Sequence, residues 1–310
     1  METAESNRQN SYVPNPTNEE NQNSSAKKYL KRLKGSLISL VRRGPESAIF
    51  IPKVSRGGNW LYEWLAADNI VAHTKKPAYI LFAPGMEKWL EEFPYLKNIT
   101  RHEKDMRFRA IRVIGHHQEV EMHFSADDFR RFITTYLSSK NFQSRIMKAR
   151  QHIDKDTLVI NVRRGDYYSN PEIKRNFGIN TANYIQAAVE KSLKNKVFNK
   201  IFVVSDDLEW CSKNLSFLND IASTRFERLG QSMFDDLAAI SSSYHLILTN
   251  TTFGYWGGYI ATYMNNCQVF VPNVHQQDLS EYYKSKPRPV QHLPEWVEVV
   301  PKSPSGSWFD

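Results

Sequence analysis

The sequence predicts an α/β fold in which helices cover parallel β-sheets, and two observations lead to this prediction. Short apolar segments rich in β-branched residues alternate with longer segments of helical periodicity from about residue 47 onward. Alternation of this kind is typical of parallel strands joined by helical crossovers. The second observation is length, because 310 residues are enough for two domains of roughly 100–200 residues each.

The N-terminal segment differs from the rest of the chain in composition. Residues 1–26 are rich in Asn, Glu, Ser, Pro and Gln, so a disordered tail is expected there. A basic segment follows over 27–45, with seven Lys or Arg between Lys27 and Arg43. Its apolar residues fall at helical spacing: Leu30, Leu33, Leu37 and Val41. A surface helix packed on the first domain is favoured over a peripheral anchor on an anionic membrane, because Gly35 costs the helix about 1 kcal/mol.

The next part of the chain predicts an N-terminal Rossmann-like domain over 46–150. The expected strands are Ala48–Ile51, Ala78–Phe82 and Ile111–Ile114. The expected helices are Trp60–His73, after the turn Gly57-Gly58-Asn59, and Asp127–Leu137. Ser125 stands where the second helix needs its N-cap.

The same pattern is clearer in a predicted C-terminal domain over 151–290, which a tail over 291–310 follows. The expected strands are Thr157–Val162, Lys200–Val204, His245–Leu248 and Val269–Val271. The expected helices are Thr181–Leu193, Met233–Ser243 and Gly257–Tyr263. Charged residues interrupt the apolar pattern near 140–156, and the boundary between the halves is expected there.

Polar clusters follow three of the expected strands in the second half. They are Arg163-Arg164-Gly165-Asp166, Ser205-Asp206-Asp207 and Asn250-Thr251-Thr252. In open parallel sheets, ligands bind beyond the carboxyl ends of the strands. Neighbouring parallel strands would bring these clusters together, so the sequence predicts a ligand site there.

The first cluster suits a phosphate group. Guanidinium stays charged at neutral pH and grips phosphate oxygens in a bidentate fork, as Arg163 and Arg164 would do. Gly165 permits a sharp turn at the strand end. Asp166 would orient an arginine or take part in proton transfer. A surface turn without a ligand is the commoner occurrence of such a motif in isolation.

The other two clusters each allow two interpretations. Ser205, Asp206 and Asp207 would hold a ribose or a base edge, or else cap the helix that follows the strand. The segment from Asn250 to Phe253 would present hydroxyl and N–H groups to a phosphate, or act as a cap.

Several other classes of protein lack support in the sequence. No run reaches the ~18 apolar residues of a membrane span. No secretory signal is expected from the first 28 residues, and two cysteines fit a cytoplasmic protein. The net charge of +8 favours anionic partners. Nucleic acid is not expected, because the basic residues beyond the N-terminal segment are scattered. No Walker loop, Gly-x-Ser-x-Gly elbow or zinc-type spacing occurs.

Taken in order, the motifs carry a resemblance to a known family. The segments Val162-Arg163-Arg164-Gly165-Asp166-Tyr167, Phe202–Asp207 and Asn250–Tyr259 resemble the three C-terminal motifs of bacterial and animal α-1,2-fucosyltransferases, which form glycosyltransferase family 11. Ser55–Asn59 is similar to that family's N-terminal Gly-Asn-Gln turn, with Trp60 in place of Gln. The resemblance covers about residues 47–275.

The resemblance implies a fold and an activity. The fold would be of the GT-B type, with two Rossmann-like parallel-sheet domains facing a cleft and the second holding the donor. The reaction would be an inverting, metal-independent transfer of fucose from GDP-fucose to galactose in a glycan, with no cofactor. A surface polysaccharide, an O-antigen or a lipid-linked oligosaccharide is the expected acceptor, used by a cytoplasmic enzyme or by one attached to the inner face of the membrane.

The resemblance also implies roles for single residues. Arg163 would neutralise the β-phosphate of GDP, and Arg164 would support the loop. Asp166 is a candidate general base. The remaining donor-binding residues are Ser205, Asp206 and Asp207 at the nucleoside, Asn250, Thr251, Thr252 and Phe253 at the pyrophosphate, and Asn59 at the phosphate or acceptor side.

The sequence departs from the family pattern in two of the C-terminal motifs. Asn161 stands where the family has His, so a group that titrates near neutrality is absent there. The third motif reads Thr251-Thr252-Phe253-Gly254-Tyr255-Trp256 instead of Ser-Thr-Phe-Ser-Trp-Trp. A related transferase with another donor or linkage, or a homologue that only binds nucleotide or glycan, therefore remains open.

Overall fold

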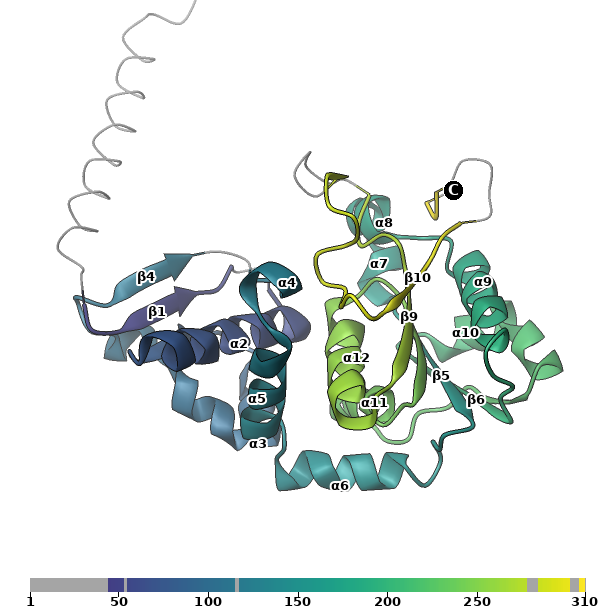
Figure 1. Cartoon of the computed structure of the whole chain (residues 1–310), viewed down its shortest axis with the longest axis horizontal. Coiled ribbons are helices and arrows are strands. Elements are labelled where there is room, and N and C mark those ends of the chain that lie inside the picture. Colours follow the sequence, from purple (N-terminus) through teal and green to yellow (C-terminus); the bar gives the residue numbers. More distant parts are fainter. Residues whose placement is uncertain (1–43, 53–54, 115–116, 278–283, 302–306, 310) are drawn as a thin grey trace, which may run out of the picture.

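The computed structural model describes residues 44–52, 55–114, 117–277, 284–301 and 307–309. The expected tail over 1–26 and the basic segment, apart from its last two residues, lie outside this part of the chain. The described residues form two parallel sheets with helices packed on them, one sheet in each half (Figure 1). The predicted α/β fold with two parallel sheets is confirmed.

The first sheet has the strand order β3-β2-β1-β4. Its strands are β1 (Ser47–Phe50), β2 (Ala78–Leu81), β3 (Thr100–Arg101) and β4 (Ile111–Ile114). Its helices are α2 (Gly57–Thr74), α3 (Glu87–Glu92), α4 (Val120–His123) and α5 (Ala126–Tyr136), with short 3₁₀ turns at Pro94–Ile99 and Glu103–Asp105. The chain runs outward from β1 to β3 and then returns to the other side of β1 with β4.

The second sheet has the order β10-β9-β8-β5-β6-β7, and all its pairs are parallel. Its strands are β5 (Thr157–Val162), β6 (Lys200–Ser205), β7 (Ser223–Arg225), β8 (His245–Leu248), β9 (Gln268–Pro272) and β10 (Val297–Val299). Its helices are α7 (Gly165–Ser169), α8 (Pro171–Phe177), α9 (Thr181–Leu193), α10 (Leu208–Asn214), α11 (Met233–Ser241) and α12 (Thr252–Asn265), with a 3₁₀ turn at Ser216–Asp220. This is the doubly wound Rossmann order, and the direction of travel reverses between β5 and β8.

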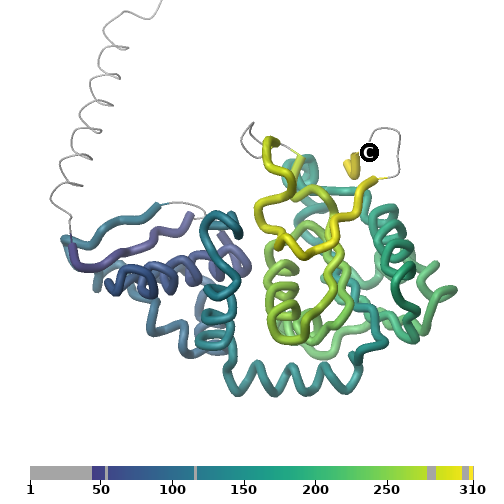
Figure 2. The backbone as a smooth tube through the Cα atoms, viewed as in Figure 1, coloured from purple at the N-terminus to yellow at the C-terminus, as the bar shows by residue number. Residues whose placement is uncertain are grey.

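The structure corrects three details of the sequence prediction. Strand β10 lies inside the segment 291–310, which was expected to be a tail, and it pairs with β9 at the edge of the sheet. Helix α12 begins at Thr252, five residues before the expected start at Gly257. Residues 140–149 form helix α6 (Lys140–Ala149), which runs between the two halves (Figure 2). The domain limits of 46–150 and 151–290 themselves stay a prediction.

Local signals explain where the helices begin. The hydroxyl of Ser125 accepts from the backbone N–H of Asp128, whose carboxylate accepts from the N–H of Ser125. This capping box confirms the predicted cap of α5. Ser139 caps α6 in the simpler way, through the N–H of Phe142. Such a cap stabilises a helix by about 1 kcal/mol.

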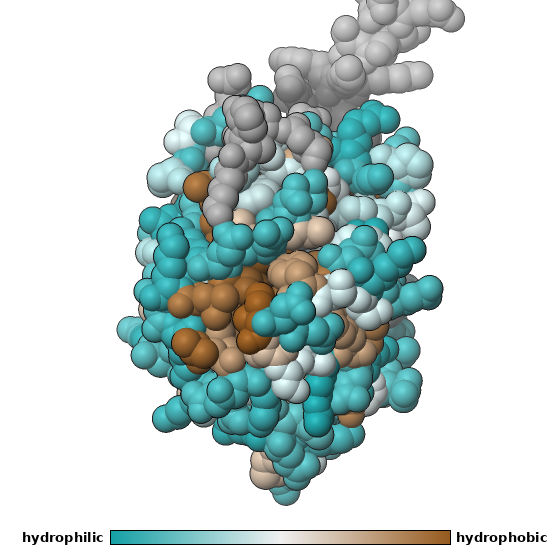
Figure 3. Space-filling model, turned by 90° about the vertical axis from the view of Figure 1, so that its right-hand side faces the viewer, coloured by the Kyte–Doolittle hydropathy of each residue, from teal (hydrophilic) through white to brown (hydrophobic). Residues whose placement is uncertain are grey.

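The side chains of each central strand in the second sheet alternate between two cores. Val159 and Leu248 face α11 and α12, whereas Ile160 and Ile247 face α9. Because both faces are covered, these strands are apolar throughout, as parallel strands usually are. On the side of α9 and α10, apolar side chains gather in a patch with hydrophilic residues around it (Figure 3).

The two halves share one core. Helix α2 packs against α12, where the hydroxyl groups of Tyr62 and Tyr259 lie 2.7 Å apart and the rings of Tyr62 and Trp256 meet at 5.2 Å. Among the described residues, no helix is long and apolar enough to cross a membrane. The contact between α2 and α12 fixes the strand ends of the first sheet relative to those of the second.

Candidate functional site

The ends of β5 and β8, which the first and third polar clusters follow, meet where the order of the second sheet reverses. The backbone N–H of Arg163, after β5, donates to the hydroxyl of Thr249, after β8, at 3.0 Å. The N–H of Thr249 in turn donates to the carbonyl of Asn161 at 3.1 Å. Ligands of doubly wound sheets bind at this switch point. The convergence expected from the sequence is therefore confirmed for these two strand ends.

Arg163 is held by two carboxylates. Its guanidinium lies 2.6 Å from Asp166 and 2.8 Å from Asp206. Burial lowers the pKa of Arg163, but the nearby carboxylates outweigh this effect and leave the pKa above its ordinary value. The two ion pairs fix the orientation of the guanidinium. Because the side chain is 38% exposed, a ligand can still reach it.

Arg164 faces the other way and supports the loop. Its guanidinium carbon lies 3.9 Å from the ring centre of Tyr168 and 3.7 Å from that of Trp210. Its Nε atom lies 3.3 Å from Asp207, and the side chain is 13% exposed. A guanidinium between two aromatic rings is a stable cation–π arrangement. This position agrees with the supporting role that the resemblance implies.

The second cluster is used mainly within the protein. Asp206 accepts from the backbone N–H of Arg164 at 2.8 Å as well as from Arg163. Asp207 caps α10 through the N–H of Trp210, and the buried hydroxyl of Ser205 accepts from the N–H of Asp207. The capping interpretation therefore describes Asp207, and Ser205 holds the backbone of that cap residue. Their contact with a nucleoside stays a prediction.

Gly165 is required where Asp206 approaches Arg163. A Cβ atom at this position would lie 2.5 Å from the carboxylate of Asp206. Glycine at position 165 thus lets the carboxylate of Asp206 reach the guanidinium of Arg163 and the backbone N–H of Arg164.

The third cluster joins a loop to the start of α12. Asn250 is buried, and its amide donates to the carbonyls of Phe177 and His275, both at 2.8 Å. Thr251 is the N-cap residue of α12, and Thr252 and Phe253 begin the helix. First-turn N–H groups have no partner inside a helix and carry partial positive charge, which suits an anion. Asn250 therefore fixes the loops, and the helix start beside it is the part suited to a phosphate.

Gly58 of α2 lies against the first turn of α12, and the substitution Gly58→Ala tests this close contact between the halves. A Cβ atom here would lie 2.7 Å from the backbone of Thr252 and Phe253. Helix propensity alone predicts that alanine stabilises α2 by about 1 kcal/mol. We expect the opposite, a loss of about 1–3 kcal/mol from overpacking against backbone. Urea unfolding measures the change, and a variant more stable than wild type would contradict the contact.

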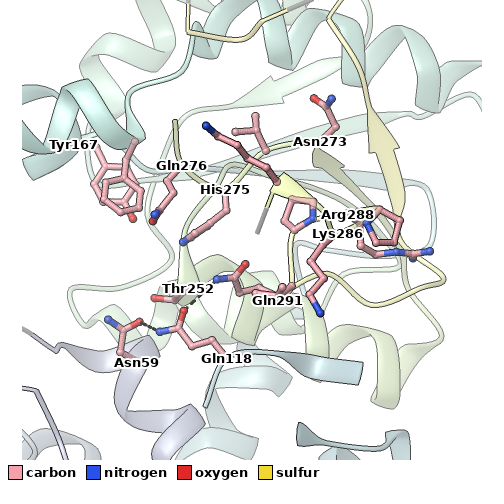
Figure 4. Close-up of a pocket in the computed structure, with 16 residues that line it drawn as sticks. Asn59, Gln118, Tyr167, Thr252, Asn273, His275, Gln276, Lys286, Arg288 and Gln291 are labelled. Atoms are coloured by element: carbon pink, nitrogen blue, oxygen red, sulfur yellow. Dashed lines mark hydrogen bonds between the residues drawn. The ribbon is translucent and has the colours of Figure 1, made fainter. Parts of the chain in front are cut away.

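A pocket of about 570 Å³ lies between the halves (Figure 4). Asn59 and Gln118 line it from the first half, and Tyr167, Thr252 and His275 line it from the second. The remaining lining residues are Phe177, Asn273, Val274, Gln276, Lys284, Lys286, Pro287, Arg288, Pro289, Val290 and Gln291. The expected cleft between two sheet domains is thus present. Of the predicted site residues, Asn59 and Thr252 line this pocket.

Sequence reasoning missed several residues of the pocket. Gln118 follows β4, and its amide donates to the Oδ1 atom of Asn59, which follows β1, at 3.1 Å. These strands lie at the switch point of the first sheet, so the strand-end argument applied there would have found Gln118. His275 and the cationic group of Lys284, Lys286 and Arg288 lie in the segment between β9 and β10 and carry no motif.

The family to which this chain belongs follows from a match to a family model. The model of glycosyl transferase family 11 matches residues 100–299. The chain belongs to glycosyl transferase family 11. The match includes all three polar clusters at the strand ends of the second sheet.

Curated relatives of this chain are named as a colitosyltransferase and as fucosyltransferases. An alpha-1,2-colitosyltransferase of Escherichia coli is 32% identical over 113 residues, which are 35% of this chain and 37% of the relative. The galactoside 2-alpha-L-fucosyltransferase Sec1 of Mus musculus is 28% identical over 143 residues, or 46% of this chain and 37% of the relative. The matches thus span little more than a third of the length of these relatives.

Solved fucosyltransferase structures are similar to parts of this family 11 chain at low identity. POFUT1 in complex with GDP matches 74% of the chain and 99% of its own, with 10% identity and a TM-score of 0.46. The fucosyltransferase NodZ from Bradyrhizobium matches 69% of the chain and 93% of its own, with 11% identity and a TM-score of 0.42.

Two of the positions that depart from the family motifs, Asn161 and Gly254, are adjacent in the structure. The amide of Asn161 donates to the carbonyl of Val204 at 3.2 Å, and its Oδ1 atom is buried without a partner among the described residues. A Cβ atom at Gly254 would lie 2.5 Å from that oxygen. Glycine at 254 therefore makes room for the side chain at 161, and the two positions differ from the family pattern as a pair.

Proposed function

We propose that this chain is an inverting α-1,2-fucosyltransferase that moves fucose from GDP-fucose to a galactose hydroxyl of a glycan. One observation carries the proposal. Arg163 stands at the switch point of the second sheet, in contact with the loop that leads into α12, with two carboxylates fixing its direction. Family membership and the names of the relatives support the same donor sugar and linkage.

The geometry suits a reaction in which a diphosphate leaves. Negative charge grows on the leaving oxygen as the bond to the sugar breaks. A charge that is already in place stabilises this change most, because it needs no reorganisation. Arg163 and the first N–H groups of α12 are such charges. Thr252, the first residue of α12, lines the same pocket as Asn59 of the first half.

Asp166 acts in this proposal as a positioning group for Arg163. Its Oδ1 atom lies 2.6 Å from the guanidinium, and its side chain is 54% exposed. The acceptor hydroxyl attacks the anomeric carbon, the bond to the diphosphate breaks, and the hydroxyl proton leaves to a base. Of the two roles considered for Asp166, the contact with Arg163 supports the orienting one.

A second donor deserves a direct test, because the colitosyltransferase is 32% identical to this chain over the matched segment. We expect a panel of nucleotide sugars, assayed by release of nucleoside diphosphate with a β-galactoside present, to give the highest kcat/KM with GDP-fucose. Greater turnover with the colitose donor would assign that sugar instead. Binding of GDP without turnover of any donor would mark the chain as a binding homologue.

The acceptor and its location belong to the proposal as well. A terminal galactose is expected from the names of the fucosyltransferase relatives. The less favoured alternative for Lys27–Arg43, contact with an anionic membrane surface, would bring the enzyme to a lipid-linked acceptor. Co-sedimentation with anionic and with neutral vesicles, compared for the full chain and a chain starting at residue 44, tests this contact.

A further inference from the structure

A chain of buried hydrogen-bonding groups leads from the pocket to the edge of the second sheet. His275 lines the pocket, and its Nδ1 atom lies 3.2 Å from the hydroxyl of Tyr255. That hydroxyl lies 3.2 Å from Nε2 of His292, whose Nδ1 atom lies 3.2 Å from the carboxylate of Glu298. The first three side chains are at most 8% exposed, whereas the carboxyl group of Glu298 is 25% exposed.

The carboxylate sets the direction of every hydrogen bond in this chain. An ionised carboxylate only accepts, so His292 must carry its proton on Nδ1. Burial lowers the pKa of His292, so the ring is neutral and its Nε2 atom is an acceptor. The hydroxyl of Tyr255 must then donate to His292, which leaves its oxygen to accept from Nδ1–H of His275.

With these directions, His275 has an acceptor atom, Nε2, at the pocket wall. Burial, with a smaller effect of His292, lowers the pKa of His275 to about 3, so this ring is neutral as well. With the proton on Nδ1, the Nε2 atom holds a lone pair. No described residue pairs with this atom, although 92% of the side chain is buried. An acceptor without a protein partner at a pocket wall suits a ligand that donates a hydrogen bond.

The opposite wall of the pocket presents donors. Gln291 donates to the Oε1 atom of Gln118, which donates to Oδ1 of Asn59, both at 3.1 Å (Figure 4). The Nδ2 atom of Asn59 then has hydrogens to donate and no partner among the described residues. A group that fits between a donor wall and an acceptor wall both accepts and donates, as a sugar hydroxyl does.

We propose that His275 binds a hydroxyl group of the ligand in the pocket by accepting its hydrogen at Nε2. Glu298 is the positioning residue, because its carboxylate fixes the tautomer of His275 through His292 and Tyr255. The identity of the ligand as a sugar rests on the proposed function. The hydroxyl belongs either to the donor nucleotide sugar or to the acceptor glycan, and the binding experiment below separates these sources.

Nitrogen-15 NMR of the histidine rings in the full chain without ligand tests the direction of the chain. We expect His275 to carry its proton on Nδ1 in the wild type. Tyr255→Phe removes the acceptor for that proton, and we expect the proton to move to Nε2, where the pocket can solvate it. Glu298→Gln allows both directions of the hydrogen-bond chain, because an amide can donate as well as accept. This variant is expected to give a mixture of the two tautomers of His275. Glu295→Gln, an exposed carboxylate of the same segment, is the matched control and should leave the tautomer unchanged.

Calorimetric titration with GDP, GDP-fucose and a β-galactoside tests the contact with the ligand. We expect Tyr255→Phe and Glu298→Gln to weaken the binding of every ligand that carries the hydroxyl roughly 2–10-fold, the effect of one neutral hydrogen bond. If only the binding of GDP-fucose is weakened, the hydroxyl belongs to fucose. Weakening of both GDP and GDP-fucose places it on ribose, and weakening of the galactoside alone places it on the acceptor.

A proton on Nε2 of His275 in the wild type, or unchanged affinity for all three ligands in both variants, would overturn the proposal. Failure of the proposed function gives a different result. In that case no fucose is transferred, while the tautomer and its dependence on Glu298 remain as described.

Discussion

Replacing Arg163 by alanine is expected to lower kcat/KM for fucosyl transfer by about 10²–10³, the usual effect of removing one group that stabilises developing charge. The guanidinium lies at the switch point and is held by Asp166 and Asp206. In its absence these carboxylates would also repel the diphosphate. Arg163→Lys is expected to recover only a small part of the kcat/KM that Arg163→Ala loses, because an ammonium group cannot bridge two partners as the planar guanidinium does.

The loss should arise from chemistry and not from unfolding. The carboxylates that pair with Arg163 are 30% and 54% exposed, so water can solvate them after the substitution. We therefore expect nearly unchanged thermal unfolding for Arg163→Ala. Arg175→Ala on α8 removes an exposed charge nearby and should keep full activity. A variant at 163 with near-normal kcat would remove Arg163 from the mechanism.

The largest effect on stability is expected at Arg145 of α6. Its guanidinium bonds Glu92 of the first half at 3.0 Å and Asp235 of the second half at 2.6 Å. These two carboxyl groups are 5% and 10% exposed. Arg145→Ala leaves both buried charges without this partner, which typically costs about 3–5 kcal/mol. We expect the free energy of unfolding to fall by about that amount.

Equilibrium unfolding in urea measures this loss. Arg150→Ala is a suitable control, because Arg150 follows α6, is exposed and bonds Asn265 at 2.8 Å. Its expected effect is below about 1 kcal/mol. Equal losses in the two variants would show that the link between Glu92 and Asp235 does not hold the halves together.

The sequence predicted the central strands well, because their signals are local. Val159 and Ile160 belong to a β-branched segment that is buried on both faces, and such a segment has few alternatives. Helix α6 was missed because its apolar residues Phe142, Ile146 and Ala149 are few and lie among charges. Strand β10 has three residues and depends on pairing with β9, which no local pattern reveals.

The site was predictable where it follows strand ends. Arg163 and Thr249 meet because β5 and β8 are neighbours, and parallel strands end at the same edge. The sequence could not separate ligand-facing residues from structural ones, since Asn250 and Asp207 are polar and yet serve as a loop clamp and a cap. His275 was missed because its role depends on Tyr255 and His292 in three dimensions.

The proposed enzyme transfers fucose at a diphosphate site centred on Arg163. The most direct test incubates the purified chain and Arg163→Ala with GDP-fucose and a β-galactoside, and determines the product linkage by NMR. We predict fucose α-linked to O2 of galactose with the wild type and at least 100-fold slower formation with Arg163→Ala. No fucosylated product from the wild type, or equal rates for the two proteins, would contradict the claim.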